Sequence, residues 1–466
     1  MTQTNSTLQA TQTAPGKASK YLNRDLSWLK FNERVLDQAK NPTRTIFERL
    51  KFLAISAGNL DEFFMIRIGS LYNYLDYKSK RVANFGLRAI PFRHKLLTEA
   101  QAFVTRQHNY YLKALLPHLA AKGCTIIKDP TQLSPQGQKR LKQYFKKALL
   151  PILTPMVFDS HHIFPALKSG ALVFGIVTCD PATKKANKKL SFIQLPQDLP
   201  RFYELDHSHS IYFVPIEEVI RIHLGWLFKN ITIRSATLFR IIRKEDFFVE
   251  ESDDIAESSL EEFKRKLKRR KAGRVVRIEI EAGYDSWMLR ILQNSWDIDQ
   301  DNIFSIPKQS LIDLQGLNQI VQHNDGKQNC ATKPATIPPL TYPTKGSGDI
   351  FEILRQQDIL LHHPYNNLDL VIDLLEKAAE DPHVLAIKMT IYRIAQNSTI
   401  IAALLKAVGN GKHVLVLFEL KARFDEAYNM KEAQKLEKAG CFIIYGISPI
   451  KTHAKLLMIV RKEQED

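Results

Sequence analysis

The sequence predicts a multidomain chain of mixed α and α/β class, with an all-helical domain first, a mixed α/β domain in the middle and an α/β domain last. Three observations lead to this prediction. The chain has 466 residues, which is too many for one hydrophobic core of ordinary size. Hydrophobic residues make up 44% of it and charged residues 25%, the balance of a folded globular protein. The spacing of the apolar residues also changes twice along the chain.

Helical periodicity dominates the first part of the chain. Residues 1–20 are rich in Ser, Thr and Gln and predict a flexible tail. Over residues 21–123 apolar side chains recur at helical spacing, most clearly in a long amphipathic run over residues 94–119. We therefore expect an all-helical domain here, with Trp28 and Phe31 in its core.

The middle of the chain, residues 124–335, has a different texture. Short apolar runs such as 171–177 alternate with polar turns, which predicts a mixed α/β domain. Residues 253–271 are acidic first and basic last, an order that suits one helix with a solvated basic face, and a strand is expected after it at 274–280. Several Pro and Gly residues over 325–348 predict a linker and hence a domain boundary near 335.

The last domain, residues 336–466, shows the alternation of apolar strands and amphipathic helices that is typical of βαβ units. The expected strands are 383–393, 412–421, 441–447 and 453–460. The expected helices are Asn367–Glu380, Ser398–Asn410 and Glu426–Ala439. A sheet with right-handed crossovers follows from this order.

Charge and cysteine content narrow the classes of protein. A net charge of +17 and a pI near 9.5 favour a polyanionic partner, but they do not choose among nucleic acid, anionic lipid and polyphosphate. The four cysteines lie far apart without a CxxC pair, which argues against a zinc site and a secreted disulfide scaffold and favours the cytoplasm. No apolar stretch reaches about 18 residues, so we expect no transmembrane segment.

His453 and Lys455 are candidate catalytic residues. They lie two residues apart in a segment expected to be a strand, so both side chains would point to one face. An imidazole supplies a nitrogen nucleophile, and an ammonium neutralises the oxygens that carry charge during phosphoryl transfer. Three residues alone are weak support, because a histidine at a strand start is more often structural.

Two arginines strengthen the case for a phosphate site. Arg393 and Arg423 each follow an expected strand, so both guanidiniums should emerge near a common rim of the sheet. A guanidinium forms two parallel hydrogen bonds with phosphate oxygens. The alternative is that each arginine pairs with a nearby carboxylate such as Asp425.

Two groups of short strings carry a resemblance to a known family. In the last domain they are His363-Pro364-Tyr365, Ala386-Ile387-Lys388, Ile391-Tyr392-Arg393, Ala422-Arg423-Phe424-Asp425-Glu426 and His453-Ala454-Lys455-Leu456. Near the N-terminus they are Asn23–Leu36 and Gly58–Phe64. In order and spacing these strings resemble the polyphosphate kinases that work through a phosphohistidine, and residues 355–461 resemble their first catalytic domain.

The resemblance implies a reversible transfer of the terminal phosphoryl group of ATP to inorganic polyphosphate, with His453 as the phosphorylated residue. It implies that Asn59 contacts the nucleotide, although Gly58-Asn59 would also suit a helix start with Asn59 as the N-cap. Arg393 and Arg423 would lie at the magnesium–nucleotide phosphates. Because an arginine has no lone pair to give a metal ion, we interpret both as phosphate clamps beside Mg²⁺ rather than as its ligands.

The family resembles a duplicated phospholipase-D-like architecture in which two similar halves each bring a histidine to one site. This chain contains one such half and ends at Asp466. A shortened chain, half of a split enzyme and a copy that only binds polyanions all remain open, and we expect the chain alone to be inactive or poorly soluble. A homo-oligomer, pairing with a missing C-terminal half and peripheral membrane association are the partner arrangements considered.

A phospholipase-D-like phosphodiesterase is the competing enzyme class, because it shares the His-x-Lys string. That superfamily usually carries an aspartate after four further residues, and here Val460 occupies this position. The kinase is therefore favoured over the hydrolase.

Overall fold

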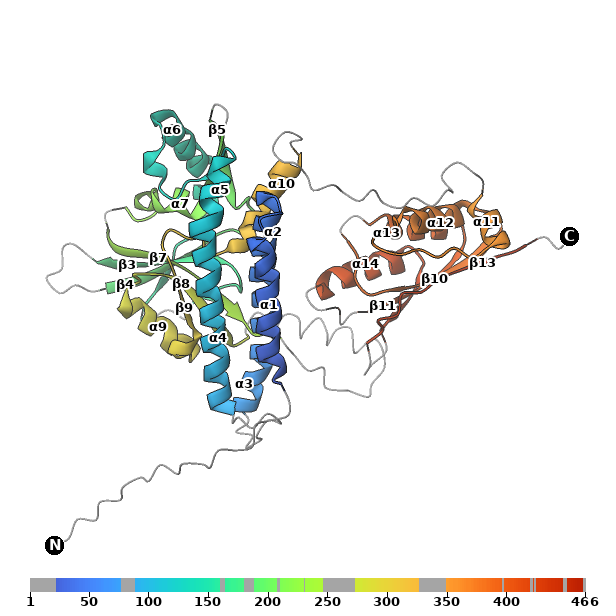
Figure 1. Cartoon of the computed structure of the whole chain (residues 1–466), viewed down its shortest axis with the longest axis horizontal. Helices are drawn as coiled ribbons and strands as arrows, with labels where there is room; N and C mark the ends of the chain where they lie inside the picture. Colours follow the sequence, from blue (N-terminus) through green and yellow to red (C-terminus); the bar gives the residue numbers. More distant parts are fainter. Residues whose placement is uncertain are drawn as a thin grey trace, which may run out of the picture. The chain divides into compact units, whose positions relative to one another are not determined.

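The computed structural model of the chain separates into two compact units, each of which is described by itself (Figure 1). The residues that the structure describes are 22–76, 89–159, 164–179, 188–207, 210–229, 231–245, 273–326, 349–395, 398–419, 422, 425–446 and 451–463. Unit 1 comprises the described residues up to 326, and unit 2 those from 349 onward. The multidomain α and α/β class predicted from the sequence is confirmed.

Unit 1 begins with long helices, as predicted. They are α1 (Arg24–Lys40), α2 (Ile46–Phe63), the π-helical turn η1 (Phe64–Ile68), α3 (Gly69–Asp76), α4 (Ala89–Tyr110), the π-helical turn η2 (Tyr111–Leu115) and α5 (Leu116–Ala121). Asn23 caps α1 by accepting from the backbone N–H groups of residues 25 and 26, and Thr45 and Glu48 form a capping box at the start of α2. Figure 1 shows α1, α2 and α4 as neighbouring rods.

The core of these helices confirms one expected aromatic and not the other. The ring of Trp28 stacks on that of Phe63, with 4.3 Å between the ring centroids. Phe31, by contrast, is 47% exposed, so its expected place in the core is wrong. The helical turn of α1 directs Leu29, Asn32 and Leu36 inward instead, and Phe31 lies off that buried stripe.

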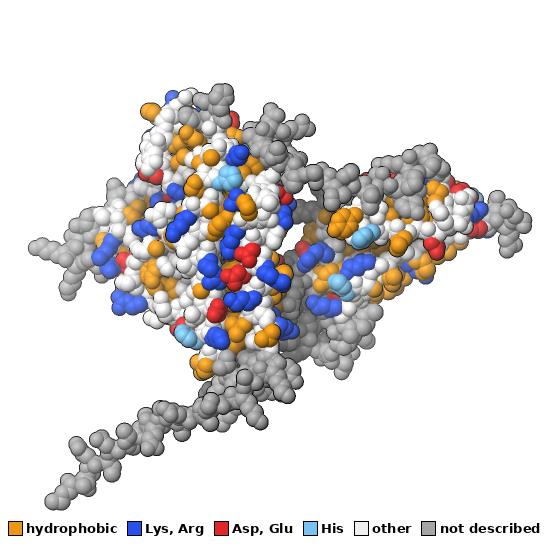
Figure 2. Space-filling view, viewed as in Figure 1, with side chains coloured by type: hydrophobic (Ala, Val, Ile, Leu, Met, Phe, Trp, Pro, Cys, Tyr) orange, Lys and Arg blue, Asp and Glu red, His pale blue; other side chains and the backbone are white. Residues whose placement is uncertain are grey.

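Charges of opposite sign lie together on the helical face of unit 1. Figure 2 shows Lys and Arg side chains intermingled with Asp and Glu along α1 and α4. Glu33 on α1 pairs with Lys30 at 3.6 Å and with Arg106 of α4 at 3.0 Å. Much of the positive charge on this face is therefore neutralised locally.

The rest of unit 1 is built on two sheets. The six-stranded sheet has the order β2-β4-β3-β7-β8-β9 and the three-stranded sheet the order β1-β6-β5. Their strands are β1 (Cys124–Ile126), β2 (Met156–Phe158), β3 (Leu172–Cys179), β4 (Lys188–Gln194), β5 (Phe202–His207), β6 (Ser210–Pro215), β7 (Thr232–Arg243), β8 (Val275–Glu281) and β9 (Ile303–Ile306). The expected strand at 274–280 is β8, whereas the expected helix at 253–271 lies outside the described residues.

The six-stranded sheet packs against the N-terminal helices on one face and against α9 (Ser286–Trp296) on the other. The further helices and helical turns of unit 1 are η3 (Pro130–Gln132), α6 (Pro135–Tyr144), η4 (Phe145–Leu149), η5 (Leu150–Ile152), α7 (Ile216–Arg221), η6 (Leu224–Trp226), η8 (Gln300–Asn302), η9 (Leu314–Leu317) and α10 (Asn318–Gly326). Gly175 on β3 allows α9 to approach, because a Cβ there would collide with the sulfur of Met288.

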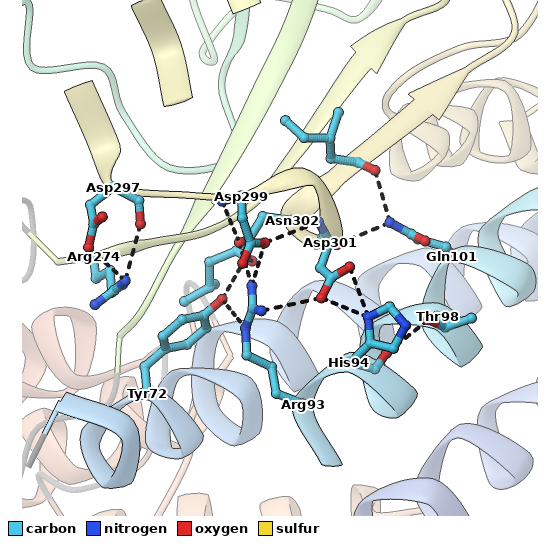
Figure 3. A network of polar contacts seen from close by, with 12 residues as sticks. Tyr72, Arg93, His94, Thr98, Gln101, Arg274, Asp297, Asp299, Asp301 and Asn302 are labelled. Atoms are coloured by element: carbon cyan, nitrogen blue, oxygen red, sulfur yellow. Dashed lines mark hydrogen bonds and ion pairs between the residues drawn. The ribbon is translucent and has the colours of Figure 1, made fainter. Parts of the chain in front are cut away.

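A polar network joins the N-terminal helices to the sheet (Figure 3). Arg93 on α4 donates to Tyr72 at 2.9 Å, to Asp299 at 2.7 Å and to Asn302 at 2.8 Å. Burial alone would lower the pKa of Arg93, but the hydrogen bond to Asp299 and the contact with Tyr72 raise that pKa above its usual value. The helices and the sheet are thus connected through a charged residue that is largely removed from water.

Unit 2 is an α/β layer with one covered sheet face. Its sheet has the order β12-β11-β10-β13, with β10, β11 and β12 parallel and β13 antiparallel to β10. The elements are α11 (Ile350–Gln356), α12 (Asp369–Glu380), β10 (Val384–Ile391), α13 (Thr399–Gly409), β11 (His413–Phe418), α14 (Glu426–Lys438), β12 (Phe442–Tyr445) and β13 (Leu457–Arg461). Residues from α12, α13 and α14 pack on one side of this sheet. On the other side, Phe442 and Met458 are exposed.

The strand expected at 453–460 is wrong at its start, because β13 begins at Leu457. Just before this point the backbone N–H of Thr390 donates to the carbonyl of Leu456 at 3.0 Å, and the side chain of Thr390 makes the other bonds. Its hydroxyl donates to the carbonyl of Ala454 at 2.7 Å and accepts from the N–H of Leu456 at 2.9 Å. His453 therefore lies in an irregular segment before the strand rather than in the strand itself.

Candidate functional site

His453 and Lys455 lie against the same aromatic ring. The imidazole of His453 meets the ring of Tyr392 edge to face, with 4.9 Å between centroids and 77° between planes. The Nζ atom of Lys455 lies 5.0 Å from the centroid of that ring and donates to the carbonyl oxygen of His453 at 2.6 Å. The sequence thus correctly places the pair together, although an aromatic neighbour and not strand alternation does so.

Tyr392 is held by elements that are distant in sequence. It follows the end of β10, and its carbonyl accepts from the side-chain amide of Asn429 at 2.8 Å. The same amide donates to the carbonyl of Glu419 at 3.2 Å, and Asn429 is fully buried in α14. The ends of β10 and β11 are therefore tied to one helix, which fixes the position of the aromatic ring.

Glu419 holds the segment that carries the histidine. Its side chain is buried just after β11, and it accepts from the backbone N–H of Thr452 at 2.7 Å. Its own N–H donates to the carbonyl of Ile391 at 2.8 Å. A buried carboxylate thus orders the residue next to His453. Sequence reasoning missed Glu419, Asn429 and Thr390, because their roles depend on contacts between segments.

Arg393 points from the end of β10 to the start of α14. Its guanidinium forms an ion pair with Asp425, the N-cap residue of α14. The alternative that this arginine pairs with a nearby carboxylate is confirmed. The side chain of Arg393 is 56% exposed, so a ligand in solution can still reach its guanidinium. Arg423 lies outside the described residues.

Asn59 belongs to unit 1 and lies within α2. The helix begins at Ile46 after the Thr45 cap and continues to Phe63, so the interpretation of Asn59 as an N-cap is wrong. The amide of Asn59 donates to the side-chain oxygen of Asn32 at 3.2 Å, and Asn32 donates to the carbonyl of Ser56 at 2.9 Å. These bonds fix the amide of Asn59 between α1 and α2, where it is half-buried.

A buried ion cluster pins α2 two residues after Asn59. The carboxylate of Asp61 accepts from Arg240 at 3.0 and 3.1 Å, from Gln315 at 2.8 Å, and from Arg277. Arg240 also pairs with Glu279. Burial alone would lower the pKa of Arg240, but the charges of Asp61 and Glu279 outweigh burial and raise that pKa.

The cluster also affects a neighbouring histidine. His108 on α4 is buried and shares a hydrogen bond of 2.7 Å with the hydroxyl of Ser310. Burial, followed by the positive charges of Arg240 and Arg277, lowers the pKa of His108 to about 3. This imidazole is therefore neutral at physiological pH.

The described residues offer neither a cluster of metal ligands nor a membrane-spanning helix. Within the ranges given above, His, Cys, Asp and Glu side chains form no group of three or more that could hold a metal ion. None of the described helices is both long and apolar enough to cross a membrane.

Family models match three consecutive parts of the chain. The model of the polyphosphate kinase N-terminal domain matches residues 21–127, that of the middle domain residues 136–320, and that of the C-terminal domain 1 residues 349–466. The chain belongs to the polyphosphate kinase family. Asn59 lies within the N-terminal match and the cluster residue Arg240 within the middle match.

Individual polyphosphate kinases agree with this assignment. The chain is 36% identical to polyphosphate kinase from Streptomyces coelicolor, over 96% of this chain and 59% of the relative. It is 37% identical to polyphosphate kinase from Halalkalibacterium halodurans, over 96% of this chain and 63% of the relative. The crystal structure of polyphosphate kinase from Porphyromonas gingivalis is similar with a TM-score of 0.73 and 27% identity, over 96% of this chain and 63% of that one. The chain thus spans about three-fifths of these polyphosphate kinases.

Proposed function

We propose that this chain takes part in the reversible transfer of the terminal phosphoryl group of ATP to inorganic polyphosphate, with His453 as the phosphorylated residue. The observation that carries the proposal is the arrangement of His453 and Lys455 on the ring of Tyr392. Both side chains are exposed, so a phosphate chain could reach them from solvent. The family membership supports the same chemistry.

The proposed chemistry needs one nucleophile and compensating positive charge. A ring nitrogen of His453 uses its lone pair to attack the terminal phosphorus of ATP, and the bond from that phosphorus to the bridging oxygen breaks as ADP leaves. A terminal oxygen of polyphosphate then attacks the same phosphorus and frees the histidine. Lys455 would neutralise the phosphoryl oxygens in both steps, since phosphoryl transfer depends mainly on positioning and electrostatics.

Asn59 and two arginines are the residues proposed for nucleotide binding. We propose that Asn59 contacts the nucleotide and that Arg393 and Arg423 clamp its phosphates. Mg²⁺ would accompany the nucleotide phosphates, whose charge it neutralises when bound. Because a guanidinium repels a metal ion and attracts phosphate, the two arginines would act on the oxygens beside Mg²⁺.

The cytoplasm is the proposed location, because ATP is abundant there and the free cysteines suit a reducing compartment.

The uncovered face of the unit 2 sheet is the proposed association surface. Phe442 and Met458 are exposed on one row across the strands, through Leu415 and Lys388. A second copy of this chain or a second catalytic half could cover the exposed apolar side chains of this row.

A labelling experiment tests the proposed nucleophile. The purified chain is incubated with ATP labelled at the terminal phosphate, and acid-labile, base-stable phosphoprotein is quantified. Labelling reports only the first half-reaction, so it can occur in a chain that makes no polyphosphate. We expect labelling of the wild-type chain, loss of it in His453→Ala, and retention in His413→Ala, which removes another exposed histidine of unit 2. Undiminished labelling of His453→Ala would remove His453 from this role. If the second catalytic half is required, adding it should restore labelling only to chains that keep His453.

A further inference from the structure

Helix α6 and the turn η4 that follows it carry an unusual density of positive charge. Five basic residues occur within nine positions, namely Lys139, Arg140, Lys142, Lys146 and Lys147, and all five are exposed. No Asp or Glu occurs in the sequence between Asp129 and Asp159. This basic face, defined by the five residues, lies in the middle domain and far along the chain from His453.

Packing fixes the direction of the basic face. Leu141, Phe145 and Leu149 recur every four residues and are fully buried, and Phe145 stacks on the ring of His223 at 4.6 Å. Lys139, Lys142 and Lys146 recur at intervals of three and four on another side of the same helical run. Since the apolar stripe is locked into the core, the cations are held toward solvent.

Among the described residues, no carboxylate neutralises the positive charge of this face. None of the five cations forms an ion pair with a described carboxylate, in contrast to Lys128 nearby, which pairs with Glu218. The mixed charges on α1 and α4 show the usual arrangement on this molecule (Figure 2). Clustering like charges on one helix is unfavourable unless an anion joins them.

An exposed tryptophan holds two of the lysines. The Nζ atoms of Lys142 and Lys146 lie 5.7 and 4.5 Å from the centroid of the Trp226 ring. The cation–π contacts keep both ammonium groups close together despite their mutual repulsion. They also occupy part of the surface of the indole, which leaves less of it to stack on a nucleobase.

The geometry points to this basic face as a docking site for the polyphosphate chain, separate from the catalytic residues. The inference rests on the proposed function for its choice of polyanion. A chain of phosphates without bases matches a convex row of point charges and needs no aromatic stacking, whereas single-stranded nucleic acid gains much of its affinity from such stacking. A cavity of about 300 Å³ at the start of α6 shares Arg140 with the basic face, but the cavity is excluded from the site because Asp206 contributes a carboxylate to its lining.

Binding of fluorescent long-chain polyphosphate to the purified chain tests the inference. The variant Lys139→Gln/Lys142→Gln/Lys146→Gln removes three cations from the basic face. The control Lys51→Gln/Lys95→Gln/Lys113→Gln removes three exposed lysines from α2, α4 and η2, with the same change in net charge. All six positions are exposed, so circular dichroism should show both variants folded.

We expect the α6 variant to bind long-chain polyphosphate about tenfold more weakly at low salt, and the slope of log K against log salt to become shallower by about two. The control variant should change binding less than threefold. Equal losses in both variants would show a general effect of net charge and overturn the inference. Equal or tighter binding of single-stranded DNA with the same dependence on α6 would also overturn it, in favour of a nucleic-acid surface.

Phosphohistidine formation separates this inference from the proposed function. The α6 variant should still be labelled by ATP at the wild-type level, because its substitutions lie outside the residues assigned to phosphoryl transfer. A chain that binds polyphosphate through α6 but is never labelled would contradict the proposed function alone. A labelled chain whose polyphosphate binding ignores the α6 substitutions would contradict the docking site alone.

Discussion

Replacing Asp61 by alanine should lower the free energy of unfolding of unit 1 by about 3–5 kcal/mol. The carboxylate is buried and accepts hydrogen bonds from Arg240, Arg277 and Gln315. Without it, the two buried guanidiniums would depend mainly on Glu279. Arg277 already has its Nε and Nη1 atoms without a hydrogen-bond partner among the described residues. A buried charge that loses its partner is far more destabilising than the pair was stabilising.

The magnitude can be bounded by a matched carboxylate on the surface. Asp37 pairs with Lys40 at 2.8 Å, yet its side chain is 52% exposed, against 7% for Asp61. Exposed ion pairs of this kind contribute about 0.5 kcal/mol or less within a helix. The Asp37→Ala variant should therefore unfold nearly as the wild-type chain does, so the two variants isolate the effect of burial.

Urea unfolding followed by tryptophan fluorescence measures unit 1 separately. All four tryptophans, at positions 28, 226, 287 and 296, lie in unit 1, so the signal does not report on unit 2. Trp28 stacks on Phe63, which lies in α2 two residues after Asp61. A loss below about 1 kcal/mol for Asp61→Ala, comparable to that of Asp37→Ala, would refute the interpretation of the cluster as a buried, mutually dependent set of charges.

Three other predictions follow from named contacts. Tyr392→Ala should lower labelling of His453 about tenfold, whereas Tyr392→Phe should stay within about twofold, because the ring makes the contacts; equal losses would contradict this. The pKa of His108 is lowered from 6.5 to about 3, so between these pH values the unfolded chain binds a proton that the native chain does not. The free energy of unfolding should therefore fall as pH drops from 6.5 toward 3, by at most about 1.4 kcal/mol per pH unit. In His108→Gln, the free energy of unfolding should fall less steeply over the same pH range. Met458→Lys should reduce self-association in sedimentation experiments, whereas Lys462→Gln should not.

The sequence predicts the regular elements of unit 2 because their signals are local. The helices expected at 367–380, 398–410 and 426–439 are α12, α13 and α14, and no end differs by more than two residues. Amphipathic spacing and glycines after the helices lie within the segments themselves, so nothing distant is needed to recognise them. The same holds for the parallel strands β10, β11 and β12.

The errors occur where a distant residue replaces a local bond. The segment before β13 has strand-like composition. Its backbone groups at Ala454 and Leu456, however, bond to the side-chain hydroxyl of Thr390, which lies more than sixty positions earlier in the sequence. Gly58-Asn59 has the composition of a helix start, but the Thr45 capping box begins α2 earlier and the helix passes through. Short local patterns therefore identified Asn59 and His453 as residues of interest without giving their backbone conformation.

The candidate residues His453 and Asn59 are held by different physical means, and this difference bears on how each should respond to mutation. His453 is exposed, and its orientation depends on Tyr392 and on one backbone hydrogen bond from Thr452 to the buried carboxylate of Glu419. Asn59 sits in a helix that the Asp61 cluster fixes through several buried bonds. Since phosphoryl transfer depends on positioning, loss of Glu419 should disturb the histidine with little effect on the stability of unit 1, and loss of Asp61 should do the reverse.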